Sequence, residues 1–101
     1  MRLLLFFDLP MDTAEGRREY SRFRKYLIKN GFIMLQKSVY CKLAVNQGSA
    51  DALTEAVRRN RPPEGVIQTL LITEKQYSRM EFILGETHGD VLDSDERFLE
   101  L

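Results

Sequence analysis

Five consecutive apolar residues near the N-terminus, Leu3 to Phe7, run directly into Asp8, and Leu9 and Pro10 follow. A short continuous apolar run that is bounded by proline is typical of a buried strand. We therefore expect a strand over Arg2–Leu9 that is covered on both sides and carries a carboxylate at its end. This strand limits the possible folds most, because the rest of the domain has to be built around it.

The next segment has the pattern of an amphipathic helix. Asp12 or Thr13 can cap its N-terminus, and Asn30–Gly31 is a typical stop signal. An apolar face recurs at helical spacing and is made by Tyr20, Phe23 and Leu27. We expect this face to pack against the first strand.

The opposite face of the same helix is basic. At 100° per residue, its cations fall within about 60° of one another; they are Arg18, Arg22, Lys25 and Lys29. No acidic residue interrupts this stripe, although an ordinary exposed face usually mixes both signs. Two interpretations remain open: the stripe contacts nucleic-acid phosphates, or it is a solvated helix face.

The remaining elements are read from the same signals. Phe32–Val45 is either a tight hairpin around Gln36–Ser38 or one long bent strand. Gly48–Ser49 opens a second helix that ends near Asn60, with Leu53, Ala56 and Val57 inward. Val66–Thr73 is the next clear strand, and residues 74–84 suggest a turn followed by another strand. Three arginines, Arg58, Arg59 and Arg61, either cap the second helix at its C-terminus or contact a partner.

This order predicts an α+β, ferredoxin-like β-α-β-β-α-β domain with additional C-terminal strands. We place the domain at residues 1–84, and an acidic loop with a C-terminal strand at 85–101, exchanged with or added to a partner subunit. Both helices cover one face of the sheet. The other face is too apolar to meet water, so we expect a homodimer.

The net charge of zero hides an uneven distribution. Residues 1–84 carry 14 Lys and Arg against 9 Asp and Glu, whereas residues 85–101 carry 1 against 6. A basic body suggests a polyanionic partner, and the acidic tail either shields that surface or is simply solvated. The apolar N-terminal run is too short for a signal peptide or a membrane span, so we expect a cytoplasmic protein.

Asp8 is the one residue with an evident chemical use, since the sequence has no glycine-rich phosphate loop, no His/Cys cluster and no Ser–His–Asp set. A single carboxylate is a poor Mg²⁺ site, because Mg²⁺ is usually held by one or two carboxylates with water and phosphate oxygens. A two-fold dimer can supply a second Asp8. The alternative is an aspartate that caps the following turn.

At this point the residues resemble a known family. The strand that ends in Asp8, the arginine-rich helix, the stretch GFIMLQKSVYCKL and the later TEKQY are similar to the small ferredoxin-like protein of CRISPR spacer acquisition. That family is usually described as CRISPR-associated endoribonucleases. The combination FFDLP, GFIMLQKSVY and TEKQY resembles the branch found beside CRISPR systems with a single large effector nuclease.

The resemblance implies partners that the residues alone do not. Family members are homodimers in which the C-terminal segment of one chain adds a strand to the other's sheet. RFLEL at 97–101 matches that segment, which implicates Phe98, Leu99 and Leu101 in the dimer interface. The dimer bridges two integrase dimers, and the heterohexameric complex carries foreign duplex DNA to the CRISPR array. The integrase supplies the strand-transfer chemistry.

The resemblance also implies a competing role, because metal-dependent endonuclease activity is attributed to the family, with the matching Asp8 binding Mg²⁺ across the dimer. The family's DNA-contacting arginines match Arg17 and Arg18, while Arg22 and Lys25 follow from helical phase; Arg79 is a further candidate. Phosphate binders outnumber catalysts, which favours a bridging subunit over a nuclease. A third hypothesis is a ferredoxin-like oligomerisation module without nucleic acid.

Overall fold

Strand β1 (Arg2–Asp8) lies at an inner position of a four-stranded antiparallel sheet whose strand order is β2-β3-β1-β4. The structure is a computed structural model, and it describes residues 1–86. Strand β1 pairs with β3 on one side and with β4 on the other, so that Leu4 faces Cys41 and Leu70. The apolar run near the N-terminus therefore forms an inner strand, as predicted.

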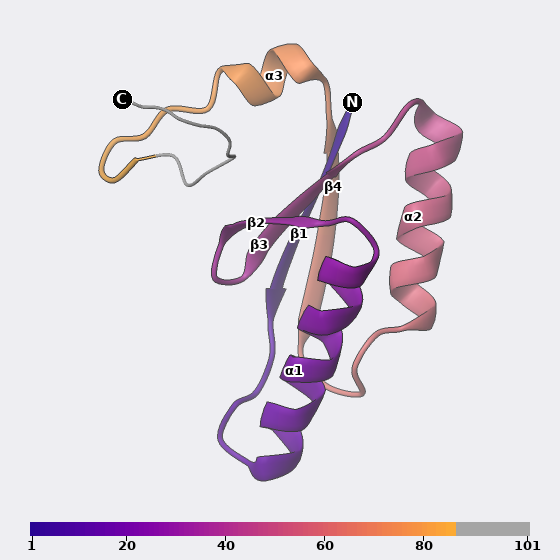
Figure 1. The fold of residues 1–101 in the computed structure, drawn as a ribbon, viewed down its shortest axis with the longest axis vertical. Helices are drawn as coiled ribbons and strands as arrows, with labels where there is room; N and C mark the ends of the chain where they lie inside the picture. Colours follow the sequence, from indigo (N-terminus) through magenta and orange to yellow (C-terminus); the bar gives the residue numbers. More distant parts are fainter. Residues whose placement is uncertain (87–101) are drawn as a thin grey trace.

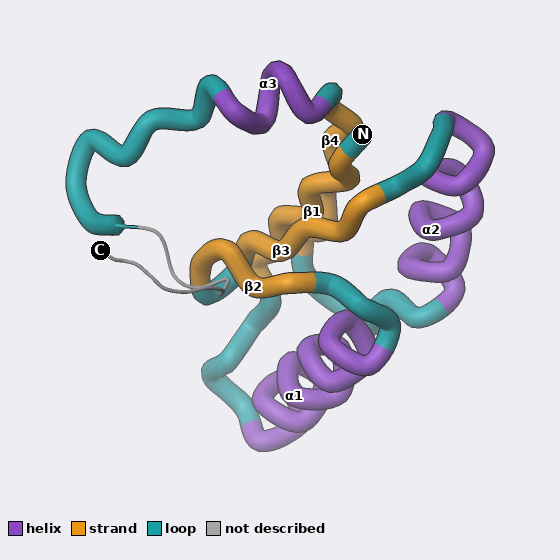
Figure 2. The backbone as a smooth tube through the Cα atoms, turned by 45° about the horizontal axis from the view of Figure 1, so that its top comes forward, coloured by secondary structure: helices purple, strands orange, loops and turns teal. Residues whose placement is uncertain are grey.

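Helix α1 (Ala14–Lys29) and helix α2 (Gln47–Arg59) both cover one face of the sheet (Figures 1 and 2). The Thr13 side chain accepts a hydrogen bond from Gly16 N at 2.9 Å and caps α1. Asn46 caps α2 in the same way through Ser49 N. The element order is the ferredoxin-like one that the sequence predicts.

The core lies between the sheet and the two long helices. Phe23 and Leu27 of α1 are fully buried against alternate residues of β1, namely Leu3, Leu5 and Phe7. The Phe7 ring meets the Phe23 ring edge-on, with 5.4 Å between centroids. Together, side chains that pack in this way stabilise the folded state by roughly several kcal/mol, and they hold α1 over the sheet.

The segment between the two long helices is a tight hairpin. Strand β2 (Ile33–Gln36) pairs with β3 (Val39–Leu43), and Lys37 and Ser38 form the turn. The register shifts between Met34 and Gln36, which marks a bulge before the turn. The alternative of one long bent strand is therefore wrong.

Strand β4 (Val66–Ile72) is followed by a short helix, α3 (Glu74–Ser78), and not by the turn and further strand that we expected over residues 74–84. No strand occurs over residues 79–86. The cause is a capping box: the Thr73 hydroxyl accepts from Gln76 N, and the Gln76 side chain accepts from Thr73 N. Helix α3 lies on the opposite side of the sheet from α1 and α2 (Figure 2).

The sheet face away from α1 and α2, which we call the open face, is only partly covered by residues 1–86. Several of its apolar side chains are half exposed or more; these include Ile33, Leu43, Val66 and Leu70. Helix α3 and residues 80–84 cover only one end of it, over a cavity of about 750 Å³. Among the helices described, none has the length and apolar character needed to cross a membrane.

Candidate nucleic-acid interface and the Asp8 strand end

Asp8 lies at the end of β1, opposite Val66 at the beginning of β4, and its side chain is exposed. Because side chains alternate along a strand, Asp8 belongs to the open face, with Leu4 and Phe6. The cap of α1 is Thr13, so capping that helix is not the role of Asp8. The carboxylate is held at a fixed place on the rim of the sheet.

Two glycines fix the backbone around Asp8. Gly65 has a φ of 111°, and a Cβ at this position would lie 2.6 Å from Leu9 Cδ2 and 2.7 Å from Asp8 O. At the other side of the loop, a Cβ at Gly16 would lie 2.5 Å from Pro10 O. Both approaches are too close for any larger residue. The loop after β1 is therefore tightly packed between α1 and the residues that precede β4.

One chain does not supply a metal site at this position. Within residues 1–86 there is no group of three or more His, Cys, Asp or Glu side chains that could hold a metal ion. An exposed carboxylate without a second acidic ligand is a weak Mg²⁺ site. The residues fit a Mg²⁺ ion only if a second chain brings its own Asp8 close.

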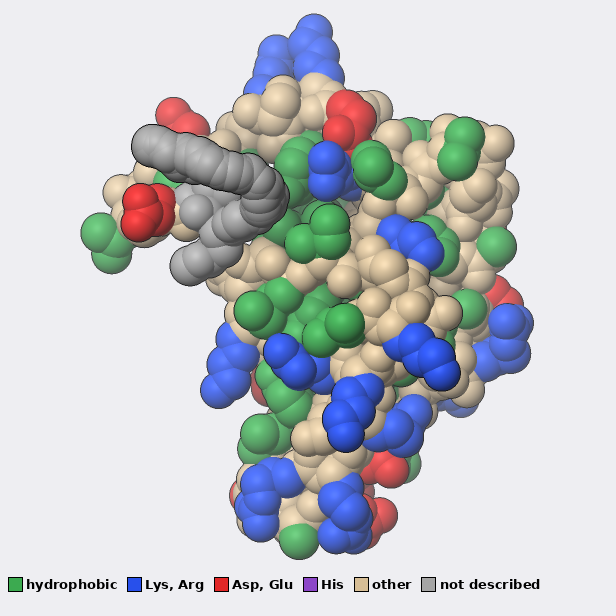
Figure 3. Space-filling model, viewed as in Figure 1, with side chains coloured by type: hydrophobic (Ala, Val, Ile, Leu, Met, Phe, Trp, Pro, Cys, Tyr) green, Lys and Arg blue, Asp and Glu red, His purple; other side chains and the backbone are tan. Residues whose placement is uncertain are grey.

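The basic side chains of α1 are all exposed; they are Arg17, Arg18, Arg22, Arg24, Lys25 and Lys29. In Figure 3, Lys and Arg side chains gather over α1, which occupies the lower part of the view in Figure 1. The structure thus brings four of the predicted residues, those at positions 17, 18, 22 and 25, together on one helix. Such a surface is suited to a phosphate backbone, because it offers many cations and no base-reading pocket.

The sequence suggested that no acidic residue interrupts the basic stripe of α1, but the structure places one acid beside it. Glu19 lies three residues before Arg22, and their side chains form an ion pair at 2.9 Å. Arg22 also donates to Asn60 O at 3.1 Å, so this arginine links α1 to the end of α2. Arg18 and Lys25 make no ion pair with any residue from 1 to 86, which leaves them available to phosphates.

Arg17 has a local structural role. Its guanidinium donates to Met11 O at 3.1 Å and closes the loop that leads into α1. An arginine has five N–H donors, so this bond leaves others for a ligand. The first turns of α1 also contain Glu15 and Glu19, which line a hollow of about 250 Å³ together with Glu64. A phosphate backbone would avoid that acidic side of the helix and approach from the Arg18 side.

Arg79 is not part of this surface. It caps the C-terminus of α3, which lies at the end of the molecule remote from the beginning of α1 (Figure 1). Helix α3 is held there by Arg2, whose Nε donates to both carboxylate oxygens of Glu74 at 3.1 Å. The Arg2 guanidinium also stacks on the Tyr77 ring, 4.2 Å from its centroid. The predicted interface residues Phe98, Leu99 and Leu101 lie outside the described residues.

Sequence reasoning missed the buried hydroxyl of Tyr40 and the influence of the Arg24 charge on it. Tyr40 is fully buried, and its hydroxyl has no hydrogen-bond partner among residues 1–86. Burial raises the pKa of the Tyr40 phenol, and the nearby Arg24 charge partly offsets the rise. Helical phase could have found this arginine, because Arg24 lies one turn after Tyr20 and therefore borders the buried face of α1.

Known proteins resemble this chain over its length. Residues 1–80 match the family model described as CRISPR associated protein Cas2. Two proteins named CRISPR-associated endoribonuclease Cas2, from Treponema denticola and Ligilactobacillus salivarius, are 52% and 48% identical over 101 residues, with full coverage of both chains in each case. The crystal structure of Streptococcus pyogenes Cas2 aligns with this chain with a TM-score of 0.63 at 21% sequence identity. The alignment covers 84% of this chain and 100% of the Streptococcus pyogenes chain.

Proposed function

Because this chain belongs to the Cas2 family of CRISPR-associated proteins, we propose that it is a non-catalytic bridging subunit of the CRISPR spacer-integration complex. In this role a homodimer holds foreign duplex DNA by its phosphates between two integrase dimers and presents it to the CRISPR array. The site of action is the cytoplasm, where the array DNA is found.

One observation carries this proposal: α1 exposes a row of cations that can contact phosphates, among them Arg18 and Lys25. Phosphate contacts position a duplex without reading its sequence. A protein that captures DNA of arbitrary sequence needs contacts of this kind. The interface on α1 thus supplies binding, and the chemistry of integration is left to the integrase.

The proposed dimer forms through the open face of the sheet. Exposed side chains such as Leu43 and Leu70 make this face apolar, and face-to-face packing of two sheets would remove them from water. We also propose that residues 85–101 are exchanged with or added to the partner subunit. The two α1 helices of such a dimer give a longer basic surface than one chain can offer.

The test is spacer integration in vitro with the cognate integrase. The binding variant is Arg18→Glu with Lys25→Glu, because these two residues make no ion pair in residues 1–86. We expect this variant to lose most integration and most affinity for duplex DNA, and the remaining binding to depend less on salt. Asp8→Ala should integrate at close to the wild-type rate.

Lys37→Glu with Lys75→Glu is the matched control, since both lysines are exposed and the net charge changes equally. This control should integrate normally. Equal loss in both double variants would show that net charge alone matters, and it would overturn the assignment of the interface to α1. Loss of integration in Asp8→Ala, with the dimer intact, would overturn the non-catalytic role.

A second candidate function is a Mg²⁺-dependent endoribonuclease that uses Asp8 from both protomers. Two observations favour it: relatives of this chain carry the name endoribonuclease, and Asp8 is exposed on the face proposed to form the dimer. A bound Mg²⁺ would polarise the phosphodiester and activate water. This function requires RNA cleavage by the wild-type dimer that EDTA stops and Asp8→Asn abolishes, with Lys37→Glu as a variant that cleaves normally.

A further inference from the structure

The two long helices end in the same way, each at an asparagine that caps its C-terminus. The Asn30 side-chain amide donates to Tyr26 O at 2.8 Å. The Asn60 side-chain amide donates to Ala56 O, also at 2.8 Å. The residues that follow differ, because Asn30 precedes a glycine and Asn60 precedes an arginine. The chain thus carries one Asn–Gly pair and a structurally matched asparagine that no glycine follows.

An asparagine that precedes glycine can convert itself to an acid in water. The backbone nitrogen of Gly31 would attack Cγ of Asn30, so that an N–Cγ bond forms, the Cγ–Nδ2 bond breaks, and ammonia leaves with the proton of Gly31 N. Water then opens the resulting cyclic imide at either carbonyl, which gives aspartate or isoaspartate. Water is the only co-reactant, and nothing is oxidised or reduced. Glycine favours the attack because it has no side chain beside its nitrogen.

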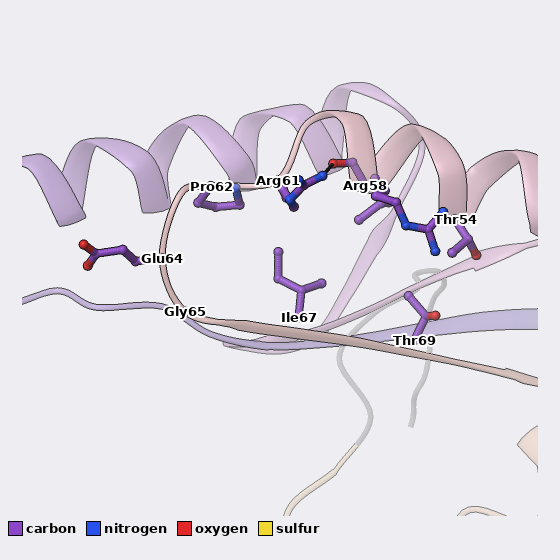
Figure 4. Close-up of a pocket in the computed structure, with 9 residues that line it drawn as sticks. Thr54, Arg58, Arg61, Pro62, Glu64, Gly65, Ile67 and Thr69 are labelled. Carbon is purple, nitrogen blue, oxygen red and sulfur yellow. Dashed lines mark hydrogen bonds between the residues drawn. The ribbon is translucent and has the colours of Figure 1, made fainter.

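The residue after Asn60 has a side chain, and that side chain is held against the helix. Arg61 folds back onto α2, where its Nη1 donates to Arg58 O at 2.7 Å (Figure 4). A side chain at position 61 obstructs attack by the backbone nitrogen of the same residue. Asn60 is therefore the internal control for a reaction at Asn30.

The fold holds the nitrogen of Gly31 away from this reaction. Gly31 N donates to Ile28 O at 3.1 Å, and Phe32 N donates to Leu27 O at 3.0 Å, which is the bond pattern of a Schellman motif. Gly31 has a φ of 88°, and Asn30 has a φ of −97° and a ψ of 19°. Attack on Cγ would have to break the Gly31 bond to Ile28 and turn the Asn30 amide away from the helix. The reaction therefore needs a chain in which the last turn of α1 is open.

Lys42 of β3 ties this turn to the sheet. Its ammonium group donates a hydrogen bond to Asn30 O. A Cβ at Gly31 would lie 3.2 Å from Lys42 Nζ, so the lysine lies directly against the turn. A cation at this position also interacts favourably with the negative end of the helix dipole. Without the Lys42 ammonium group, a larger fraction of the chains should have the last turn open.

We propose that Asn30–Gly31 is a self-modification site at which deamidation proceeds only when the last turn of α1 opens. Conversion removes the amide that donates to Tyr26 O and adds a carboxylate at the negative end of the helix dipole, which destabilises the turn. Isoaspartate also lengthens the backbone by one atom. Once modified, this helix end cannot close as before, so the modification accumulates as a record of opening. The site is independent of the proposed function, because its residues all lie within one chain.

Mass spectrometry of the full-length chain tests this proposal. Proteolytic peptides that contain Asn30 or Asn60 report the conversion of each amide with time in neutral buffer. In guanidinium chloride, Asn30 should convert before Asn60. In the folded chain, conversion at Asn30 should slow at least about tenfold, because a slow reaction of the open state follows the population of that state. An equal rate with and without denaturant would overturn the proposal, as would faster conversion at Asn60.

Lys42→Ala should increase the rate at Asn30 in the folded chain roughly fivefold, since the loss of a charged hydrogen bond opens the turn more often. The rate in denaturant should not change. Lys75→Ala is the matched control, because Lys75 lies on α3 and makes no ion pair with residues 1–86. An unchanged rate in Lys42→Ala, or an equal increase in both variants, would show that this turn does not control the reaction.

Asn30→Asp represents the aspartate product. Its Gly31 amide hydrogen should exchange with solvent about tenfold faster than in the wild-type chain, because the last turn of α1 opens more often. An unchanged exchange rate would overturn the lasting effect of the modification on this helix end.

Discussion

At the scale of single residues, Tyr40 is unusual because its hydroxyl is buried without a hydrogen-bond partner in the described part of the chain. A buried polar group without a partner costs about 1–3 kcal/mol. We therefore expect Tyr40→Phe to raise the free energy of unfolding, by up to about 1 kcal/mol after the loss of contacts is counted. Urea denaturation measures this change.

The alternative is that the Arg24 guanidinium hydrogen-bonds to Tyr40 in solution. In that case Tyr40→Phe would lower the free energy of unfolding of the wild-type chain. In a chain that already carries Arg24→Ala, the same substitution would have no such effect. Arg24→Ala in an otherwise wild-type chain is therefore the control, and a double-mutant cycle gives the coupling between the two side chains.

The same residue predicts a dependence on pH. The pKa of Tyr40 is raised in the folded chain, so ionisation at high pH favours the unfolded chain. The free energy of unfolding should fall as the pH rises above about 10, the usual tyrosine value. Tyr40→Phe should show a smaller fall over that range, and an identical fall would contradict the assignment.

At the scale of elements, Gly65 determines how the loop before β4 meets the end of β1. Its positive φ and the short approach to Asp8 O exclude a side chain. Gly65→Ala should lower the free energy of unfolding by about 2–4 kcal/mol, from backbone strain and overpacking together. Gly48→Ala is the control, because a Cβ at Gly48 meets only Asn46 Oδ1, at 3.4 Å, and alanine suits a helix. Similar stabilities for the two variants would contradict this account.

Helix α3 depends on Arg2 for its position. A helix of five residues is not stable by itself, and Arg2 joins it to the sheet through Glu74 and Tyr77. Arg2 Nη1 also lies 3.9 Å from Cys41 Sγ and covers that thiol. We expect Arg2→Ala to release α3 and to increase the rate of Cys41 modification by a thiol reagent about tenfold.

Arg2→Lys is the matched variant for this experiment. It keeps the charge but lacks the planar fork that contacts both Glu74 oxygens and stacks on Tyr77, so it should give an intermediate rate. If Cys41 reacts equally slowly in all three proteins, Arg2 does not hold α3.

At the scale of the whole molecule, the open face decides the oligomeric state in our proposal. Leu70 is 53% exposed in one chain and lies on this face. A buried, unpaired carboxylate at this position would be costly, so we expect Leu70→Glu to weaken the dimer by about 100-fold or more. Sedimentation measures the dissociation constant. Val45→Glu is the control, because Val45 lies beyond the end of β3 and is 89% exposed.

Dimerisation of the Leu70→Glu chain with wild-type affinity would place the interface elsewhere. Loss of the dimer in both variants would point to charge rather than to the contact at Leu70. In either case the basic surface on α1 would remain, because it is built within one chain.

Local signals in the sequence determined most of the fold. Proline and glycine positions, the cap at Thr13 and the periodicity of Phe23 and Leu27 are properties of neighbouring residues, and they located the two long helices and the strands β1 and β4. The same signals left the β2–β3 hairpin as one of two alternatives and missed α3. The row of cations on α1 follows from the same periodicity. The family was recognisable for a related reason, since FFDLP and QKSVY are contiguous stretches.

Tertiary structure decided which of those residues are free to act. Arg22 forms an ion pair with Glu19 and a hydrogen bond to Asn60 O at the end of α2. Only folding brings Arg2 to Glu74, which lies 72 positions later in the chain. Among residues 1–86, the position of β4 at the edge of the sheet also arises from strand order, which no local pattern encodes. Periodicity shows which way a side chain points along its own element, whereas its partners depend on how distant elements pack.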